Sequence, residues 1–341
     1  MLHTTCRQWQ EGSDRVNYGL RLHFLDSDCT IIEHPSGNLT MVDMGTTGRT
    51  DPVDYYCRHF STCLRGRRQP RELFRFIATH PDMDHISGLA NLIARVPVAN
   101  FWYVAPNVEK PGFDGSPYRE EDWHSFQNAV SGGLSVHAIS PKAGQTGSWT
   151  DDGIYIWAPS PEDERLAERG NRPNLASYVL AIRHGRGLVV LGGDAEAATW
   201  QRLYETYAWP PGVTVTVIKA PHHGHDTAYF KPIVAAMRPR LTIVTPDGDR
   251  EHDGCRLYEC HSRVLRTDRR GNIVVAVSPS GKFTYKSERP SALTSPFLPP
   301  PPVPAWLASP WSPPTPMPIP PPPTPPRTLS IPSWPPYTYL R

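Results

Sequence analysis

The chain has 341 residues, with 35 Lys and Arg, 33 Asp and Glu and a formal net charge of +2. This balance excludes the strong overall basicity or acidity that would by itself indicate a nucleic-acid or membrane partner. From residue 290 onward roughly every second or third residue is proline, which lacks the N–H needed for helix and sheet hydrogen bonds. We therefore predict a globular domain over residues 1–289, long enough for one sizeable core, and a disordered Pro-rich tail over residues 290–341.

The N-terminal segment and the cysteines bear on where the protein works. Residues 1–17 are polar and charged and lack the apolar core of a secretory signal, and no apolar run approaches the length needed to cross a bilayer. Six cysteines at uneven spacing do not resemble a disulfide framework and suit a reducing compartment. We expect a cytoplasmic protein without membrane insertion. The Pro-rich tail is either a passive extension or a ligand for a protein partner with an aromatic-lined groove.

Short β-rich runs bounded by turn residues predict strands, and apolar-periodic stretches predict helices. In the first half, strands are predicted at residues 20–25, 29–33, 39–42, 73–78, 101–104, 134–139 and 154–157, and helices at 51–64, 86–95 and 118–130. In the second half, strands are predicted at 178–182, 188–191, 213–218, 241–244, near 264 and at 273–277, and helices at 195–207 and 229–237. Strands interleaved with helices predict an α/β protein, or α+β on a stricter definition, whose sheets are covered by helices.

Four metal-ligand side chains follow the apolar run 73–78 within six positions: His80, Asp82, Asp84 and His85. Burying two imidazoles and two carboxylates so close together is costly unless each is hydrogen-bonded, paired or coordinated. A divalent cation meets that demand. The segment therefore predicts a metal site at the carboxyl end of a strand.

Two other predicted strands end in the same way. Asp194 follows the strand 188–191, and His222 and His223 follow the strand 213–218. Ligands of α/β sheets bind in crevices at the carboxyl ends of strands, so we expect the three strand ends to form one polar cluster. Alone, Asp194 would also suit the N-cap of the following helix.

The donor types indicate the ions and the chemistry. Imidazoles and carboxylates without thiolates suit one or two catalytic zinc or manganese ions that share a carboxylate. Such an ion lowers the pKa of its bound water to about 7, which favours hydrolysis by a metal-bound hydroxide. Asp43 is expected to support the ligand loop by hydrogen bonds. Weaker candidates are His225, His137 and an unusually spaced zinc set of Cys255, Cys260, His252 and His261.

The segment His80-Pro81-Asp82-Met83-Asp84-His85 resembles the HxHxDH signature of metallo-β-lactamase fold hydrolases, with Asp82 in place of the middle histidine. Over about residues 20–285 the chain also resembles the C-terminal domain of the ComEC competence proteins. The segments that carry this likeness include Val42-Asp43-Met44-Gly45, Leu191-Gly192-Gly193-Asp194 and Lys219-Ala220-Pro221-His222-His223-Gly224. The resemblance implies a four-layer αββα sandwich with a metal site at its edge.

The resemblance also implies a role for each ligand. His80 and Asp82 would hold a first ion, Asp84 and His85 a second, Asp194 would bridge them and His222 would complete the second site, with His223 as the competing choice. Asp84 and His223 are further expected to act in catalysis. Where the wider family has a histidine before the Gly192-Gly193-Asp194 strand, this chain has Asn174 and Ser177, and an oxygen-rich first site would favour manganese.

The expected activity is metal-dependent hydrolysis of phosphodiester bonds in a nucleic-acid or small-molecule substrate, as a nuclease or phosphodiesterase. One alternative is hydrolysis of a thioester, lactone or β-lactam by the same chemistry, and another is a non-catalytic scaffold that presents the Pro-rich tail. Arg65, Arg67, Arg68 and Arg71 form a dense basic cluster near the ligand loop, and residues 263–270 form a second. Such clusters either engage phosphates or are solvated surface.

Overall fold

The computed structural model describes residues 19–64, 67–105, 107–206, 215–249 and 251–289. The predicted Pro-rich tail and the N-terminal segment lie outside the described residues, so the division into a domain and a tail stays a prediction. Within the described residues, no helix is both long and apolar enough to cross a membrane. The expected cytoplasmic location stays a prediction.

The first sheet has eight strands in the order β16-β15-β1-β2-β3-β6-β7-β8. Its strands β1 (Leu20–Phe24), β2 (Thr30–Glu33) and β3 (Leu39–Val42) form an antiparallel meander. The strands β6 (Leu73–Ile77), β7 (Val98–Trp102) and β8 (His137–Ile139) continue the sheet parallel to β3. On the other side, β15 (Ile273–Val277) and β16 (Phe283–Ser287) complete it with antiparallel pairings.

The second sheet has six strands in the order β14-β13-β12-β11-β10-β9. Here β9 (Ile154–Ala158), β10 (Val179–His184) and β11 (Gly187–Leu191) pair antiparallel. The strands β12 (Val217–Lys219), β13 (Leu241–Val244) and β14 (Arg263–Arg266) continue from β11 in parallel. The carboxyl ends of β11, β12, β13 and β14 therefore meet at one edge.

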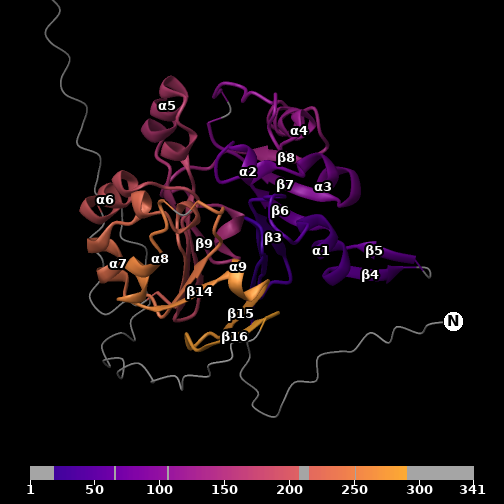
Figure 1. Ribbon diagram of the computed structural model, residues 1–341. Coiled ribbons are helices and arrows are strands. Elements are labelled where there is room, and N and C mark those ends of the chain that lie inside the picture. The colour runs from indigo at the N-terminus through magenta and orange to yellow at the C-terminus, as the bar shows by residue number, and fades with distance from the viewer. Residues whose placement is uncertain (1–18, 65–66, 106, 207–214, 250, 290–341) are drawn as a thin grey trace, which may run out of the picture.

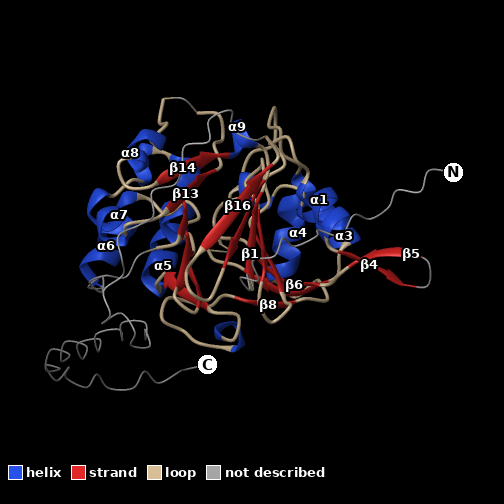
Figure 2. Cartoon of the chain, turned by 90° about the horizontal axis from the view of Figure 1, so that it is seen from below, coloured by secondary structure: helices blue, strands red, loops and turns tan. Residues whose placement is uncertain are grey.

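Helices cover the outer face of each sheet (Figures 1 and 2). Beside the first sheet lie α1 (Pro52–His59), α2 (Met83–Ile86), α3 (Leu89–Arg95) and α4 (Glu120–Val130). Beside the second lie α5 (Pro161–Gly170), α6 (Ala197–Thr206), α7 (Lys231–Met237) and α8 (Cys255–Glu259), and the short α9 (Thr267–Arg270) follows β14. One-turn 3₁₀ helices span Ser148–Thr150, Pro173–Ala176, His222–Gly224 and Asp226–Ala228.

Two apolar layers hold these parts together. Buried side chains of both sheets, such as Ile77 and Ile243, share the core between them. A second cluster packs the outer face of the second sheet against its helices, as with Val190, Trp200 and Met237. Helix, sheet, sheet and helix are thus four layers, which confirms the predicted α/β class and αββα sandwich.

Three local predictions need correction. The predicted helix 51–64 ends at His59, and the following residues form the two-stranded sheet of β4 (Ser61–Leu64) and β5 (Arg67–Pro70). The predicted helix 86–95 is broken at Gly88, where φ is +92° and a Cβ would lie 2.8 Å from Thr46. Helix α5 was not predicted, although Ser160 and Asp163 form a capping box at its start.

Candidate metal centre

The candidate site lies where the ends of four strands from both sheets meet. In the first sheet, β3 and β6 are parallel, and they are followed by Asp43 and by the segment 79–85. In the second, β11 and β12 are parallel and lead to Asp194 and to the turn 221–225. A backbone hydrogen bond joins the two sides: the N–H of Tyr178 donates to the carbonyl of Thr79 at 3.0 Å. The predicted convergence of strand ends is therefore present.

Four imidazoles surround one carboxylate oxygen, Oδ2 of Asp194. The Nε2 atoms of His85, His223, His222 and His80 lie 3.1, 3.5, 3.8 and 4.0 Å from it. Asp194 itself is 3 % exposed. A buried carboxylate with four ring nitrogens around it offers the imidazole and carboxylate donors that divalent metal sites use.

The remaining carboxylates divide the imidazoles into two groups around that oxygen. Oδ2 of Asp82 lies 3.4 Å from His80 Nε2. Oδ2 of Asp84 lies 3.0 Å from His223 Nε2 and 3.6 Å from His85 Nε2. We call His80 and Asp82 the first donor group and Asp84, His85 and His223 the second donor group. Each group combines imidazole and carboxylate donors, as zinc and manganese sites do.

Asp43 interacts with both donor groups, directly or through Thr79, on the Nδ1 side of their histidine rings. Its Oδ1 accepts a hydrogen bond from the backbone N–H of Thr79 at 2.7 Å, and its Oδ2 accepts one from the Thr79 hydroxyl at 2.9 Å. The same Oδ2 lies 3.0 Å from His85 Nδ1, and the Thr79 hydroxyl lies 3.1 Å from His80 Nδ1. Asp43 thus has the hydrogen-bonding role expected of it, which leaves the Nε2 atoms of both rings to face Asp194.

His223 is oriented in the same way. Its Nδ1 lies 3.2 Å from the backbone carbonyl of Thr245, and its Nε2 points at the second donor group. Several inward-facing atoms are buried without a hydrogen-bond partner among the described residues, namely His80 Nε2, His85 Nε2 and Asp194 Oδ1. Unpartnered buried polar atoms are rare in native proteins and costly. Coordination of a divalent ion would satisfy them, so the residues present fit one or two such ions.

In this cluster the carboxylates raise the pKa of His85 and His223, and the two histidines lower the pKa of Asp194. Burial lowers the pKa of His85, but Asp194 and the carboxylates around it outweigh burial and hold this pKa well above its ordinary value. Burial also lowers the pKa of His223, whereas Asp194 and the hydrogen bond to Asp84 raise it to about 9. Burial raises the pKa of Asp194, but His85 and His223 hold it well below the usual range. A metal ion that binds these nitrogens would displace any proton bound there, so metal binding is coupled to proton release.

The sequence left open whether His222 or His223 is the metal ligand, and the structure gives the two residues different surroundings. His223 lies in the second donor group and its side chain is 4 % exposed, whereas that of His222 is 22 % exposed and its ring stacks on His225 at 4.6 Å. Both residues have positive φ, +48° and +54°, which is strained for residues other than glycine. The turn therefore points the two imidazoles to different sides of Asp194. This geometry favours His223 over His222 as the histidine that joins Asp84 and His85.

Sequence reasoning missed Asp28 and the role of Lys219. Asp28 follows β1, and with His85, Asp194 and His223 it forms a set of buried side chains close enough to hold an ion. Lys219 Nζ lies 2.5 Å from Asp28 Oδ1. Asp28 lies in a short turn without metal-ligand spacing, so the sequence pattern carried no signal for it.

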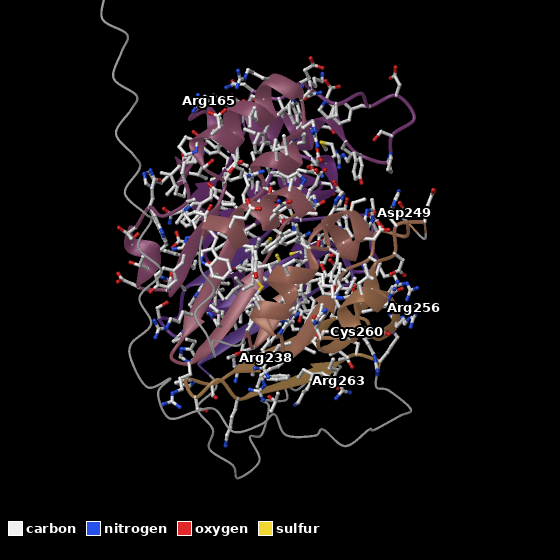
Figure 3. The ribbon with its side chains drawn as sticks, turned by 90° about the vertical axis from the view of Figure 1, so that its left-hand side faces the viewer. Arg165, Arg238, Asp249, Arg256, Cys260 and Arg263 are labelled. Atoms are coloured by element: carbon white, nitrogen blue, oxygen red, sulfur yellow. The ribbon has the colours of Figure 1, made fainter. Side chains whose placement is uncertain are left out.

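The weaker candidates do not join the cluster as ligands. His225 Nε2 lies 3.1 Å from Asp247, and His137 Nδ1 lies 3.2 Å from Asn100. In the alternative zinc set, Cys255 is buried whereas Cys260 is exposed on the face shown in Figure 3. His252 Nδ1 lies 3.3 Å from Asp226, and His261 Nε2 lies 2.8 Å from the Tyr229 hydroxyl. These four side chains therefore face different partners.

The fold and the site together define an αββα sandwich with a His and Asp cluster between the ends of its two sheets. Comparison with protein-family models gave no match, and neither did comparison with curated protein sequences. Among solved structures, a variant of CmlA β-hydroxylase matches with 12 % identity and a TM-score of 0.44, covering 76 % of this chain and 54 % of that one. This chain thus spans about half the length of that protein. Igni18, described as a metallo hydrolase from the archaeon Ignicoccus hospitalis, matches with 14 % identity and a TM-score of 0.45, covering 78 % and 98 %.

Proposed function

We propose that this protein is a metal-dependent hydrolase that binds one or two zinc or manganese ions between the ends of its two sheets. The observation that carries the proposal is the convergence of four imidazole Nε2 atoms on one buried carboxylate oxygen, while an oxygen lies within 3.2 Å of Nδ1 in three of the rings. The ions would supply Lewis acidity and lower the pKa of water for attack on an electrophile.

The two donor groups assign the residues to two ions. His80 and Asp82 would hold the first, and Asp84, His85 and His223 the second, while Asp194 is shared. The side chains of Asp82 and Asp84 are 43 % and 32 % exposed, whereas those of His80 and His85 are fully buried. Substrate would therefore approach from the side of the two aspartates.

Phosphodiester bonds are the substrate class that we favour. Two adjacent donor groups with a shared carboxylate suit an in-line displacement in which one ion stabilises the attacking oxygen and the other the leaving oxygen. The resemblance to ComEC proteins also points to a nucleic acid. A thioester, lactone or β-lactam would need the same donor groups, so the discrimination between substrates has to be measured.

The two basic clusters have different positions relative to the site. Arg67 and Arg68 lie on the β4–β5 hairpin, which leads into the amino end of β6, whereas the ligand loop follows its carboxyl end. The prediction that this cluster lies near the ligand loop is therefore wrong in three dimensions, and its Arg65 is outside the described residues. By contrast, α9 follows β14 at the same edge as the site, and Arg269 on it is exposed. Arg269 is thus the better candidate for contact with a substrate phosphate.

A substrate panel tests the proposed function. The protein, loaded with manganese or with zinc, is expected to cleave DNA, RNA or bis-p-nitrophenyl phosphate, and a chelator should stop the reaction. Turnover of thioesters, lactones or β-lactams alone would refute the phosphodiester assignment but not the hydrolase. A protein that retains far less than one equivalent of metal, fails to bind added ions and turns over none of these compounds would favour the scaffold.

Charge reversal at Arg269 should weaken nucleic-acid binding if the substrate follows the α9 edge. Arg269→Glu is expected to lower affinity and to reduce the slope of log K against log salt by about one for each phosphate that the protein no longer neutralises. The matched control is Arg67→Glu, an equal change of charge on the remote hairpin. Fluorescence anisotropy with a labelled oligonucleotide measures both variants, and an equal loss in the two would contradict a role for the α9 edge.

A further inference from the structure

A buried ion pair lies behind the second donor group. Lys219, the last residue of β12, and Asp28 each have side chains 5 % exposed, and Lys219 Nζ lies 2.5 Å from Asp28 Oδ1. The Thr245 hydroxyl donates a hydrogen bond to the same oxygen at 2.8 Å. Two donors from the second sheet thus engage one oxygen of a carboxylate that follows β1 of the first sheet. Charges are rarely buried this deeply unless they are paired.

The other oxygen of Asp28 faces the imidazoles. Asp28 Oδ2 is buried without a hydrogen-bond partner among the described residues. It lies 3.2 Å from His85 Nδ1 and 4.0 Å from His223 Nδ1. Both distances are to the ring nitrogen that points away from the metal side, because the Nε2 atoms of these rings face Asp194. Asp28 therefore faces the Nδ1 side of His85, where neither Asp28 Oδ2 nor His85 Nδ1 has a hydrogen-bond partner among the described residues, and not the Nε2 side on which an ion would bind.

We propose that Lys219 and Asp28 are positioning residues for the second ion. Lys219 and Thr245 hold one oxygen of Asp28, so that the negative charge of the other oxygen, together with Asp43, favours the orientation of His85 with Nδ1 toward these carboxylates and Nε2 toward Asp194. The Lys219 ammonium group also neutralises the negative charge of Asp28. Asp28 therefore does not need the metal ion for charge compensation and does not become a ligand. The inference rests on the proposed function of this site as a metal centre.

The density of negative charge explains why a fixed cation is useful here. Asp28 and Asp43 lie on the Nδ1 side of His85, and Asp84 and Asp194 lie on its Nε2 side. A buried carboxylate that loses its partner is strongly destabilising and attracts another cation. Without Lys219, Asp28 would compete with Asp194 for the second ion. The expected result is weaker and distorted coordination at the second site, with the first site little affected.

The test compares two variants that each remove the cation of a buried ion pair. Lys219→Met removes the proposed positioning charge. Arg75→Met is the control, because Arg75 pairs with Asp152 at 3.1 Å and both side chains are at most 2 % exposed, away from the donor groups. Titration calorimetry with manganese and zinc gives the Kd of each ion in the full chain, and Asp84→Ala identifies which Kd belongs to the second ion. The visible spectrum of cobalt-loaded protein reports the coordination geometry.

Lys219→Met is expected to weaken the second ion by roughly 10- to 100-fold, the loss typical when an outer partner of a metal ligand is removed, and to change the cobalt spectrum. The Kd of the first ion should stay within about threefold, and Arg75→Met should bind both ions as the wild type does. Wild-type affinity for the second ion in Lys219→Met, or an equal loss in Arg75→Met, would overturn the proposal.

Thr245→Val covers the case in which Lys219→Met does not fold. It removes the hydroxyl that donates to Asp28 and keeps the backbone carbonyl that faces His223. A weakened second ion and an altered cobalt spectrum are expected, and an unchanged Kd would overturn the proposal in this variant too. A wild-type protein that binds no ion would instead refute the proposed function, so the two failures are distinguishable.

Discussion

Asp84→Ala is expected to abolish turnover while leaving the domain folded. Asp84 Oδ2 lies 3.0 Å from His223 Nε2 and 3.6 Å from His85 Nε2, so the second donor group loses its one solvent-facing carboxylate. The loss should exceed the roughly 10- to 100-fold typical of an outer partner, since Asp84 is a proposed ligand. The side chain is 32 % exposed, and its removal should cost the fold little. Metal content, kcat/KM and circular dichroism measure the three effects.

Asp249→Ala is the matched control for this variant. Asp249 is an exposed carboxylate of the loop that follows β13, labelled in Figure 3, and its Oδ1 accepts from the backbone N–H of Glu251. We expect wild-type metal content and turnover from it. Near-wild-type turnover in Asp84→Ala would remove Asp84 from the proposed machinery.

His85→Ala should lose both activity and stability. The sequence alone predicts that this variant, like Asp84→Ala, leaves a folded domain, but the structure alters that expectation. His85 is fully buried, with Asp28 and Asp43 near one ring nitrogen and Asp84 and Asp194 near the other. Without the imidazole these carboxylates face one another, and uncompensated buried charge typically costs roughly 3–5 kcal/mol. Urea unfolding of the metal-free protein measures the change.

His34→Ala separates a general loss of packing from a loss specific to the site. His34 is also a buried imidazole, 3.1 Å from the backbone carbonyl of Asp152 and 3.0 Å from the Thr40 hydroxyl, without a contact to the donor groups. Its removal should lower stability and leave metal affinity unchanged. If His85→Ala unfolds at the wild-type urea concentration and still binds two ions, the proposed position of His85 at the centre of the site is wrong.

Much of the fold followed from local pattern. Short β-branched runs with turn residues between them predict strands because side chains on both faces of these sheets must be apolar. The strands at 39–42 and 241–244 have the predicted bounds. Local pattern failed where a long-range contact decided the outcome. Gly88 interrupts an apolar-periodic stretch with a left-handed conformation, and Thr46, far away in the sequence, lies 2.8 Å from where a Cβ would be.

The candidate ligands were predictable for a different reason. His80, Asp84 and Asp194 stand directly after apolar runs, and the end of a strand is a position that the sequence alone can locate. Parallel neighbours place such ends at one edge of a sheet, so several ligands could be expected together without knowledge of the packing. The sequence by itself therefore determined the α/β class and the edge at which the candidate ligands meet.

Only the tertiary structure decided which side chains face which. Asp28 lies in a turn without metal-ligand spacing. It lies near His85 because both follow strands of the first sheet, and it reaches Lys219 because the two sheets are packed face to face. The direction of each imidazole at 222 and 223 depends on two positive φ values in one tight turn. Sequence patterns report the period of a helix or strand, whereas the orientation of a side chain across a core depends on contacts between residues far apart in the chain. The ion pair behind the site could therefore be found only in three dimensions.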